Sequence, residues 1–337
     1  MSATGCPTIA AIGLDLGEFA LSGSPPAFDG TREMIAPRRT VFDKLLLDAA
    51  AEAGAEVCEG FAVTGLTRTG DRVNGIRGRT KDGGEVEETA RIVIGADGRN
   101  SLVAKAAGAE IYNQRPVLTC AVYAYWRDAV PHLAAIHPLE QRIVISFPTN
   151  DGLTITPVVF PRAQLPSVQA DLAGHLTRSL AMVPALAEPF ADAKRVERIR
   201  GTGDIPNFFR KPFGDGWALV GDAGYHKDPI LAQGISDALR SAEWVAEAVD
   251  AGLSGARPMG EALADYRRTR DEHLTPMYEL CVGMAALEPP SPEMTALWGA
   301  LRDNPVERDR YFGTLGGTVP IPEYYAPENL RRIVGAA

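Results

Sequence analysis

The chain has 337 residues, 45% of them hydrophobic, which is enough for one large core or two linked ones. Its 34 Lys and Arg against 43 Asp and Glu give a formal charge of −9, and no basic patch with interleaved aromatic residues occurs, so no nucleic-acid partner is expected. No apolar run reaches the roughly 20 residues that cross a bilayer. Residues 1–19 lack the pattern of a secretory signal.

Cysteine and histidine usage gives no sign of a metal centre or a disulfide framework. Cys6, Cys58, Cys120 and Cys281 are scattered without a Cys-x-x-Cys motif, and the five His lack metal-ligand spacing. We therefore expect a cytoplasmic protein with reduced thiols, no bound metal and no membrane span.

The first 60 residues predict a hairpin and then a helix–strand unit. Residues 8–22 alternate as two short strands joined by a tight Gly-Glu turn. Over 41–50, apolar residues recur at helical spacing, and Gly54 is placed to end that helix. A strand is expected to follow at once over 55–60, as in an α/β sheet.

The middle of the chain is predicted to be rich in strands. Residues 61–95 have the pattern of a β-meander whose last strand, 91–94, is a continuous apolar run, and a helix is expected from Ser101. Residues 117–163 are aromatic and β-branched, which predicts a separate antiparallel sheet. A strand–loop–helix pattern returns over 216–252.

Helical patterns cover 168–195 and 258–283, the second broken near Pro276, and short helical pieces are expected in the Pro-rich tail. The fold class predicted is α/β with α+β character. One domain is built from two segments far apart in the sequence, with an antiparallel β-domain inserted between them. The expected boundaries are 1–30 (strands of the inserted domain), 31–110 (first domain, first part), 111–205 (inserted domain), 206–285 (first domain, second part) and 286–337 (C-terminal extension).

The strongest functional signal is the segment 217–237, WALVGDAGYHKDPILAQGISD. A short apolar strand ends in Gly221 and Asp222, a Pro- and Gly-bearing loop follows, and an amphipathic helix begins at Gly234. The unpaired N–H groups and partial positive charge of a helix start suit an anionic or electron-rich ligand edge. The spacing indicates a nucleotide-type cofactor, although many strand–Gly–helix turns bind nothing.

Two motifs on either side of the β-rich insert resemble those of the flavoprotein monooxygenases of the hydroxybenzoate-hydroxylase type, a superfamily that includes geranylgeranyl reductases and flavin halogenases. Residues 95–101 (GADGRNS) are similar to the family's Asp-Gly fingerprint, and residues 221–226 (GDAGYH) to its Gly-Asp fingerprint. Residues 39–43 (RTVFD) resemble its Arg-x-x-Leu-Asp helix start. The resemblance covers about residues 1–285 and implies an FAD-binding Rossmann-like domain with an inserted antiparallel β-sheet substrate domain.

The resemblance implies five residues on the flavin side of an FAD site. Asp222, next to Gly221, would bond the ribityl hydroxyls, and Pro229 would lie against the flavin ring. The backbone of Gly234 and Ile235 would face the pyrimidine edge, where a reduced flavin carries negative charge that a helix N-terminus stabilises.

Four further residues are implied away from the flavin ring. Arg39 would bond the FAD phosphate or ribityl chain, because Arg recognises paired oxygens, and the backbone of Val63 would touch the adenine. Asp97, beside Gly98, would orient the cofactor region and assist docking of NAD(P)H. Both charged residues have structural alternatives, Asp97 as a turn residue and Arg39 as a surface residue at a helix start.

This chain departs from the family pattern in three places. Ala232 stands where Gly is usual, and Ala104 and Lys105 stand where an Arg commonly follows. The chain also lacks Gly-x-Gly-x-x-Gly, which the family carries on an N-terminal βαβ unit that binds the pyrophosphate, so we expect roughly 60 residues upstream, including a central strand between 56–58 and 91–94. The alternative is a short chain that binds FAD poorly, as a degenerate relative or one completed by a partner chain.

The function implied is that of an FAD-dependent oxidoreductase, in particular an NAD(P)H-dependent monooxygenase that hydroxylates an organic small molecule through a flavin C4a-hydroperoxide. Its rivals are a flavin-dependent reductase of isoprenoid double bonds and a non-catalytic remnant without FAD; a halogenase is disfavoured because Trp-x-Trp-x-Ile is absent. Tyr225 and His226 would serve either chemistry or loop packing, and no acid/base pair is assigned. Four aromatic residues would either face the substrate or fill a sheet core: Tyr123, Tyr125, Trp126 and Phe147.

Overall fold

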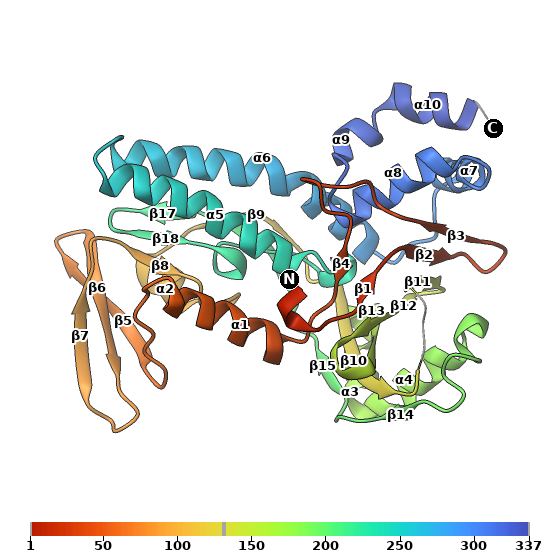
Figure 1. The fold of residues 1–337 in the computed structure, drawn as a ribbon, viewed down its shortest axis with the longest axis horizontal. Helices are drawn as coiled ribbons and strands as arrows, with labels where there is room; N and C mark the ends of the chain where they lie inside the picture. The colour runs from red at the N-terminus through yellow and green to blue at the C-terminus, as the bar shows by residue number, and fades with distance from the viewer. Residues whose placement is uncertain (1, 130–132, 336–337) are drawn as a thin grey trace. The chain divides into compact units, whose positions relative to one another are not determined.

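Two compact units make up the computed structural model, which describes residues 2–129 and 133–335. Both units combine segments far apart in the sequence (Figure 1). Because each contains helices and strands, the predicted α/β class is confirmed. The first unit comprises residues 1–55, 118–205 and 283–337, and the second comprises 56–117 and 206–282.

A mixed sheet of eight strands is the centre of the first unit. The strands follow the order β14-β10-β13-β12-β11-β2-β3, with β15 also pairing β10. All pairs are antiparallel except β2 with β11. The strands are β2 (Ile12–Asp15), β3 (Ala20–Gly23), β10 (Thr119–Arg127), β11 (Ala134–Leu139), β12 (Arg142–Thr149), β13 (Leu153–Pro161), β14 (Lys194–Arg195) and β15 (Arg200–Thr202).

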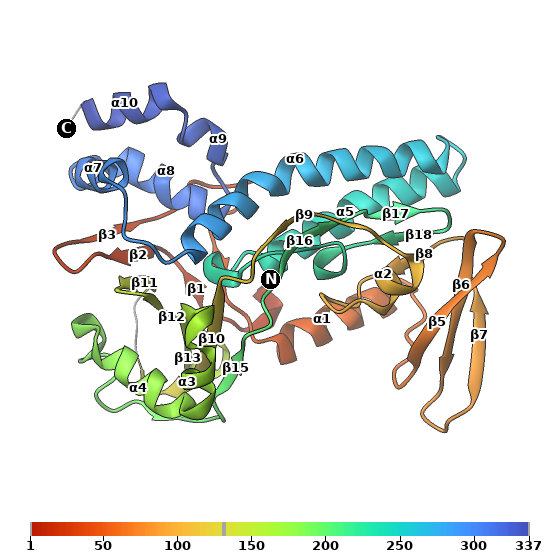
Figure 2. The ribbon, with the colours of Figure 1, turned by 180° about the vertical axis from the view of Figure 1, so that it is seen from behind.

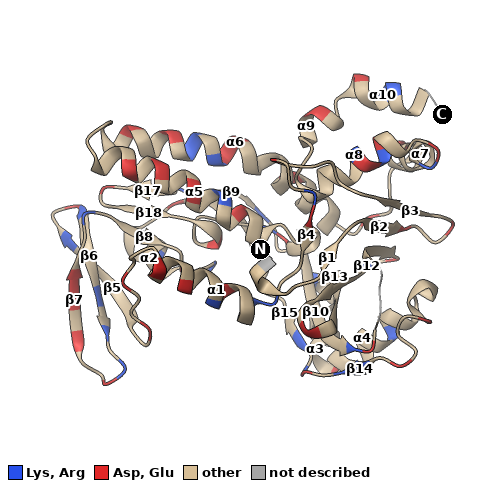
Figure 3. Cartoon of the chain, viewed as in Figure 1, with Lys and Arg blue, Asp and Glu red and all other residues tan. Residues whose placement is uncertain are grey.

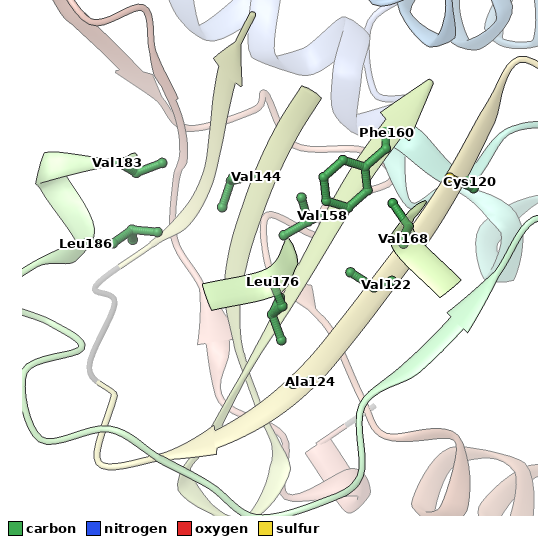
Figure 4. Close-up of a cluster of buried hydrophobic side chains, with 10 residues drawn as sticks. All are labelled: Cys120, Val122, Ala124, Val144, Val158, Phe160, Val168, Leu176, Val183 and Leu186. Atoms are coloured by element: carbon green, nitrogen blue, oxygen red, sulfur yellow. The ribbon is translucent and has the colours of Figure 1, made fainter. Parts of the chain in front are cut away.

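Helices cover one face of this sheet, as Figure 4 shows. Alternate residues of β10 point into the core because side chains in a strand alternate between its two faces. Phe160 of β13 is fully buried there, against Leu176 and Val168 from the helices α4 (Leu172–Ala181) and α3 (Leu165–Ala170). The antiparallel sheet predicted from 117–163 is therefore confirmed.

The N-terminal segment follows its prediction only in part. β2 and β3 form the expected hairpin, with Leu16 N–H donating to Phe19 O at 3.0 Å. The residues before them form a separate strand, β1 (Thr8–Ile9), which pairs with β4 (Met34–Ile35). The expected helix is α1 (Arg39–Glu52), after which Gly54 adopts a φ of +97°.

The strand predicted over 55–60 is wrong. These residues are exposed, and no strand within the described residues pairs with them, so they have neither the burial nor the hydrogen bonds that define a strand. By its contacts α1 belongs to the first unit, whereas the sequence placed 31–55 in the cofactor domain.

The C-terminal tail forms short helices that pack within the first unit. Ser24 N–H donates to the Asp309 carboxylate at 2.9 Å, and a Cβ at Gly23 would collide with Phe312, so the tail lies closely against the β3 end. The helices are α7 (Pro292–Leu301), α8 (Pro305–Gly316), α9 (Ile321–Tyr324) and α10 (Pro327–Gly335).

The second unit contains three small sheets. The predicted meander is confirmed for its first three strands, which form the antiparallel sheet β5-β6-β7. Its predicted last strand is wrong as part of the meander, because β8 belongs to another sheet and pairs in parallel with β18. The third sheet has the order β19-β16-β9. The strands are β5 (Ala62–Thr69), β6 (Arg72–Arg79), β7 (Glu85–Thr89), β8 (Val93–Gly95), β9 (Ile111–Arg115), β16 (Asn207–Arg210), β17 (Phe213–Gly214), β18 (Trp217–Leu219) and β19 (Tyr225–His226).

Two long helices lie side by side in this unit, α5 (Gly234–Leu253) and α6 (Met259–Ala285) (Figure 2). Val245 and Tyr266 from the two helices pack on Val220 at the end of β18. Acidic and basic residues are interspersed along α5 and α6 (Figure 3). A shorter helix, α2 (Leu102–Ala107), follows β8.

The break predicted near Pro276 is wrong, because α6 continues through it. Leu274, Met277 and Tyr278 on either side of the proline are buried, and their packing offsets the one backbone hydrogen bond that a proline removes. Within the described residues, no helix is both long and apolar enough to cross a membrane.

Candidate functional site

A cavity of about 80 Å3 opens in the second unit where β18 ends and α5 begins. Gly221, Asp222, Pro229 and Gly234, all named from the sequence, line it together, and Ile235 follows Gly234 at the helix start. Asp222 and Pro229 are exposed, so their side chains are accessible to a ligand. The other lining residues are Tyr225, His226, Lys227, Asp228, Asp237 and Ala238.

The backbone of this loop has two left-handed positions. Gly221 has a φ of +53°, its N–H donates to Ser241 Oγ at 3.0 Å, and a Cβ there would lie 3.2 Å from Ala238 Cβ. Both the dihedral angle and the close approach require glycine. Ala232 has a φ of +55°, a left-handed conformation that glycine adopts with less strain than alanine.

The start of α5 is suited to a ligand. Its N-cap residue, Gln233, makes no side-chain cap, and Asp237 N–H makes a first helical hydrogen bond to Gln233 O at 3.0 Å. A Cβ at Gly234 would meet no atom within 4 Å. The space beside Gly234 is therefore open, and the partial positive charge of a helix start favours an electron-rich group there.

A buried ion pair, which the sequence analysis missed, forms part of the cavity wall. Lys227 Nζ donates to Asp237 Oδ2, and the two side chains are 4% and 5% exposed. The ammonium also lies 5.0 Å from the Tyr225 ring centre. The ten-residue separation matches no motif, so no sequence pattern connected Lys227 with Asp237.

Two residues that the sequence left undecided, Tyr225 and His226, are packed in the loop. Tyr225 is buried against Phe209 and Tyr278, and its hydroxyl makes no hydrogen bond. Burial raises its pKa well above the usual range. His226 stacks on Phe208, its Nδ1 contacts Pro206 O, and burial lowers its pKa, so the ring is neutral at pH 7.

Asp97 caps the helix that follows it. Its carboxylate accepts hydrogen bonds from Leu102 N–H at 2.7 Å, Val103 N–H at 3.1 Å and Ser101 Oγ at 2.5 Å. Gly98 beside it has a φ of +77°. The geometry thus provides the capping role that the sequence held as an alternative for Asp97.

Arg210, which the sequence analysis also missed, joins the two fingerprint loops. Its guanidinium donates to Ala223 O at 2.8 Å in the Gly-Asp loop and to Arg99 O at 3.1 Å in the Asp-Gly loop. It also lies 4.2 Å from the Phe208 ring centre. The two motifs, about 120 residues apart, are therefore neighbours in space.

The remaining predicted residues lie away from the cavity. Val63 is 37% exposed in β5, where it pairs with Gly78. Arg39 begins α1 in the first unit and pairs with Asp43 at 2.6 Å, both side chains being well exposed. Such an exposed ion pair within one helix agrees with the alternative role of Arg39 as a surface residue at a helix start.

Three of the aromatic candidates lie on one face of the first unit's sheet. Tyr125 pairs with Ile155, which in turn pairs with Phe147, and Tyr123 is two residues from Tyr125 on β10. All three candidates are half-buried. The Arg38 guanidinium lies 4.8 Å from the Tyr125 ring centre.

Trp126 takes the sheet-core role that the sequence left open, because alternation places it on the opposite face from Tyr125. Its indole N–H donates to Thr156 Oγ1 at 2.7 Å, and its ring packs against Phe190 beside the helix-covered core. Trp126 is therefore a core residue.

Comparison with known proteins decides the family. A family model described as FAD binding domain matches residues 29–279. The chain belongs to the FAD-binding domain family. The similarity of residues 95–101 and 221–226 to flavoprotein fingerprints is accordingly a family relationship.

Relatives and solved structures agree with this membership. Digeranylgeranylglycerophospholipid reductase of Methanosarcina acetivorans is 32% identical over 225 residues, 64% of this chain and 53% of that protein, so the chain spans about half of that relative's length. A flavoprotein/dehydrogenase from Cytophaga hutchinsonii has a TM-score of 0.81 at 18% identity, covering 99% of this chain and 83% of that one. The myxobacterial chondrochloren halogenase has a TM-score of 0.78 at 21% identity, covering 100% and 82%. At these identities the structural likeness concerns the fold alone.

The cavity residues of this FAD-binding domain suit the flavin end of FAD. An open helix start, an exposed carboxylate at Asp222 and a glycine that permits close approach match the ring edge and ribityl hydroxyls. The pyrophosphate of FAD is usually bound by a Gly-x-Gly-x-x-Gly turn that joins a strand to a helix. The described residues include no such turn.

Proposed function

We propose that this chain provides the flavin site of an FAD-dependent oxidoreductase, and that the enzyme is an NAD(P)H-dependent monooxygenase that hydroxylates a small organic molecule in the cytoplasm. The observation that carries the proposal is the cavity at 221–238, where a strand end, an exposed carboxylate and an uncapped helix start converge. Bound FAD supplies the redox chemistry.

The chain's own residues have distinct roles in this proposal. Asp222 accepts hydrogen bonds from the ribityl hydroxyls, Pro229 packs against the ring, and the N–H groups of Gly234 and Ile235 stabilise negative charge at the ring edge. Asp97 acts indirectly, by fixing the start of α2 and its loop.

The substrate side is assigned to the half-buried aromatic face of the first unit, with Tyr123, Tyr125 and Phe147 as its contacts. Aromatic side chains provide a large apolar surface, and a tyrosine hydroxyl adds one polar group. This composition suits a substrate that combines an apolar or aromatic body with a few polar substituents.

A second candidate function is the reduction of isoprenoid-type double bonds. The 32% identity with a digeranylgeranylglycerophospholipid reductase favours it. The two activities differ in their need for oxygen: a monooxygenase consumes O2, whereas a reductase transfers electrons directly to its substrate.

The first experiment is a titration of the purified chain with FAD, followed by flavin fluorescence and visible absorbance. We expect saturable binding, and we expect Asp222→Asn to weaken it about tenfold or more, because a charge-assisted hydrogen bond is worth roughly 1.5–3 kcal/mol. Asp215→Asn is the matched control, since this exposed carboxylate precedes β18 and does not line the cavity.

No binding by the wild type, or equal affinity of Asp222→Asn and wild type, would refute the site. Oxygen uptake during NAD(P)H oxidation then separates the two activities. A rate of NAD(P)H oxidation that is unchanged without O2, with the substrate gaining two hydrogens, would establish the reductase and exclude the monooxygenase.

A further inference from the structure

The Lys227–Asp237 pair is placed where it can act on a bound ligand. Both side chains line the cavity with Gly221, Asp222 and Gly234, and both are almost completely buried. Asp237 lies in the first turn of α5, so the pair joins the loop to the helix start.

Each charge of this pair is unfavourable in the buried wall unless the opposite charge is present beside it. Moving two charged groups from water into a buried site costs more free energy than the attraction within most surface ion pairs provides. A helix start also carries a partial positive charge, which repels the ammonium. The Asp237 carboxylate offsets both the desolvation cost and this repulsion for the Lys227 ammonium. Loss of either partner would leave a single buried charge without its counter-ion in the wall.

The groups around the pair keep their protonation states near neutral pH. Burial raises the pKa of Tyr225 well above its usual range and that of Cys281 to about 12, so both stay protonated. His226 stays neutral because burial lowers its pKa. The other charged or titratable neighbours are Asp222 and Asp228 in the loop and Arg270 and Tyr278 on α6.

We propose that the Lys227–Asp237 pair sets the reduction potential of the flavin bound in this cavity, by keeping the wall beside the helix start electrically neutral. The proposal rests on the flavin site proposed above. The reduced flavin is the more negative form, so an extra anion in the wall disfavours reduction and an extra cation favours it. Lys227 and Asp237 are thus positioning residues for charge, and neither exchanges a proton with the substrate.

The test is the midpoint potential of FAD bound to two variants, measured between about pH 7 and pH 9, above the lowered pKa of His226 and below that of Cys281. Lys227→Met leaves the Asp237 carboxylate without its cation in the cavity wall, so the potential should fall below that of the wild type. Asp237→Asn leaves the Lys227 ammonium without its anion, so the potential should rise above that of the wild type.

Two controls separate charge from structure. Lys227→Arg keeps the charge and should retain the wild-type potential across the pH range. Arg257→Met breaks an exposed ion pair with Asp265 in the same unit, 2.7 Å long, and should leave the potential unchanged.

The outcomes distinguish this inference from the proposed function. If the wild type binds no FAD, the proposed function fails and the inference fails with it. If FAD binds but the potentials of the two variants do not shift, or shift in the same direction, the inference alone is overturned. If Lys227→Met does not fold, Asp237→Asn decides; if neither folds, the pair is a folding determinant and the proposal is wrong.

Discussion

Replacement of Arg210 by Met should loosen the two fingerprint loops together. The side chain donates one hydrogen bond to Ala223 O and one to Arg99 O, and nothing else in the described residues links these two carbonyls. A hydrogen bond from a charged group is worth about 1.5–3 kcal/mol when buried. Because Arg210 is half-buried, water replaces part of this, and we expect a total loss of about 2–3 kcal/mol in the free energy of opening.

The assay is native-state amide hydrogen exchange at α2, which follows the Asp-Gly loop, and at β18, which precedes the Gly-Asp loop. A loss of about 2–3 kcal/mol corresponds to exchange that is roughly 30- to 150-fold faster. Arg210→Lys retains the charge but has a single ammonium that cannot reach both carbonyls in this geometry, so it should recover only part of the loss. Exchange within threefold of the wild type in Arg210→Met, with the fold intact, would refute the linkage between the loops.

Three further predictions concern stability. Ala232→Gly should raise the free energy of unfolding by about 1 kcal/mol in urea titrations, because the left-handed backbone strains an L-residue, and no gain would show that the loop relaxes around the alanine. Phe160→Ala should cost about 3–5 kcal/mol by creating a cavity in the sheet core, while the control Phe28→Ala, at a side chain 56% exposed, should change stability by less than about 0.5 kcal/mol. Since burial lowers the folded-state pKa of His226, the unfolded chain takes up the proton first, and stability should fall as the pH drops below about 6.5. The loss in Tm between pH 7 and pH 5.5 should therefore be smaller in His226→Asn, and an equal loss would exclude His226 as a contributor.

The parts of the fold that could be predicted are those with regular local patterns. The aromatic and β-branched pattern of residues 117–163 was sufficient to predict the antiparallel sheet, whereas the shared face of Tyr123, Tyr125 and Phe147 depends on the pairing register of β10, β13 and β12. Gly-Asp before an amphipathic run was sufficient to predict the cavity at the start of α5, because strand end, loop and helix start are contiguous in sequence.

The features that could not be predicted depend on contacts between distant residues. The 55–60 segment has the composition of a strand but no partner strand in the described residues, and Pro276 breaks no helix because buried neighbours on α6 hold it in place. Arg210 and Lys227 have no motif of their own. Their roles come from carbonyl and carboxylate groups that only the folded chain places within reach.

The parallel pairing of β8 with β18 has a consequence for biosynthesis. During translation, Val93–Gly95 emerges long before Trp217–Leu219, with six of the eight strands of the first unit's central sheet, β10 to β15, made in between. A strand without its partner exposes unpaired backbone groups and apolar side chains, which promote association with other chains. We therefore expect the nascent second unit to depend on chaperones until residue 219 has left the ribosome, and slowed translation across 118–205 to increase its aggregation.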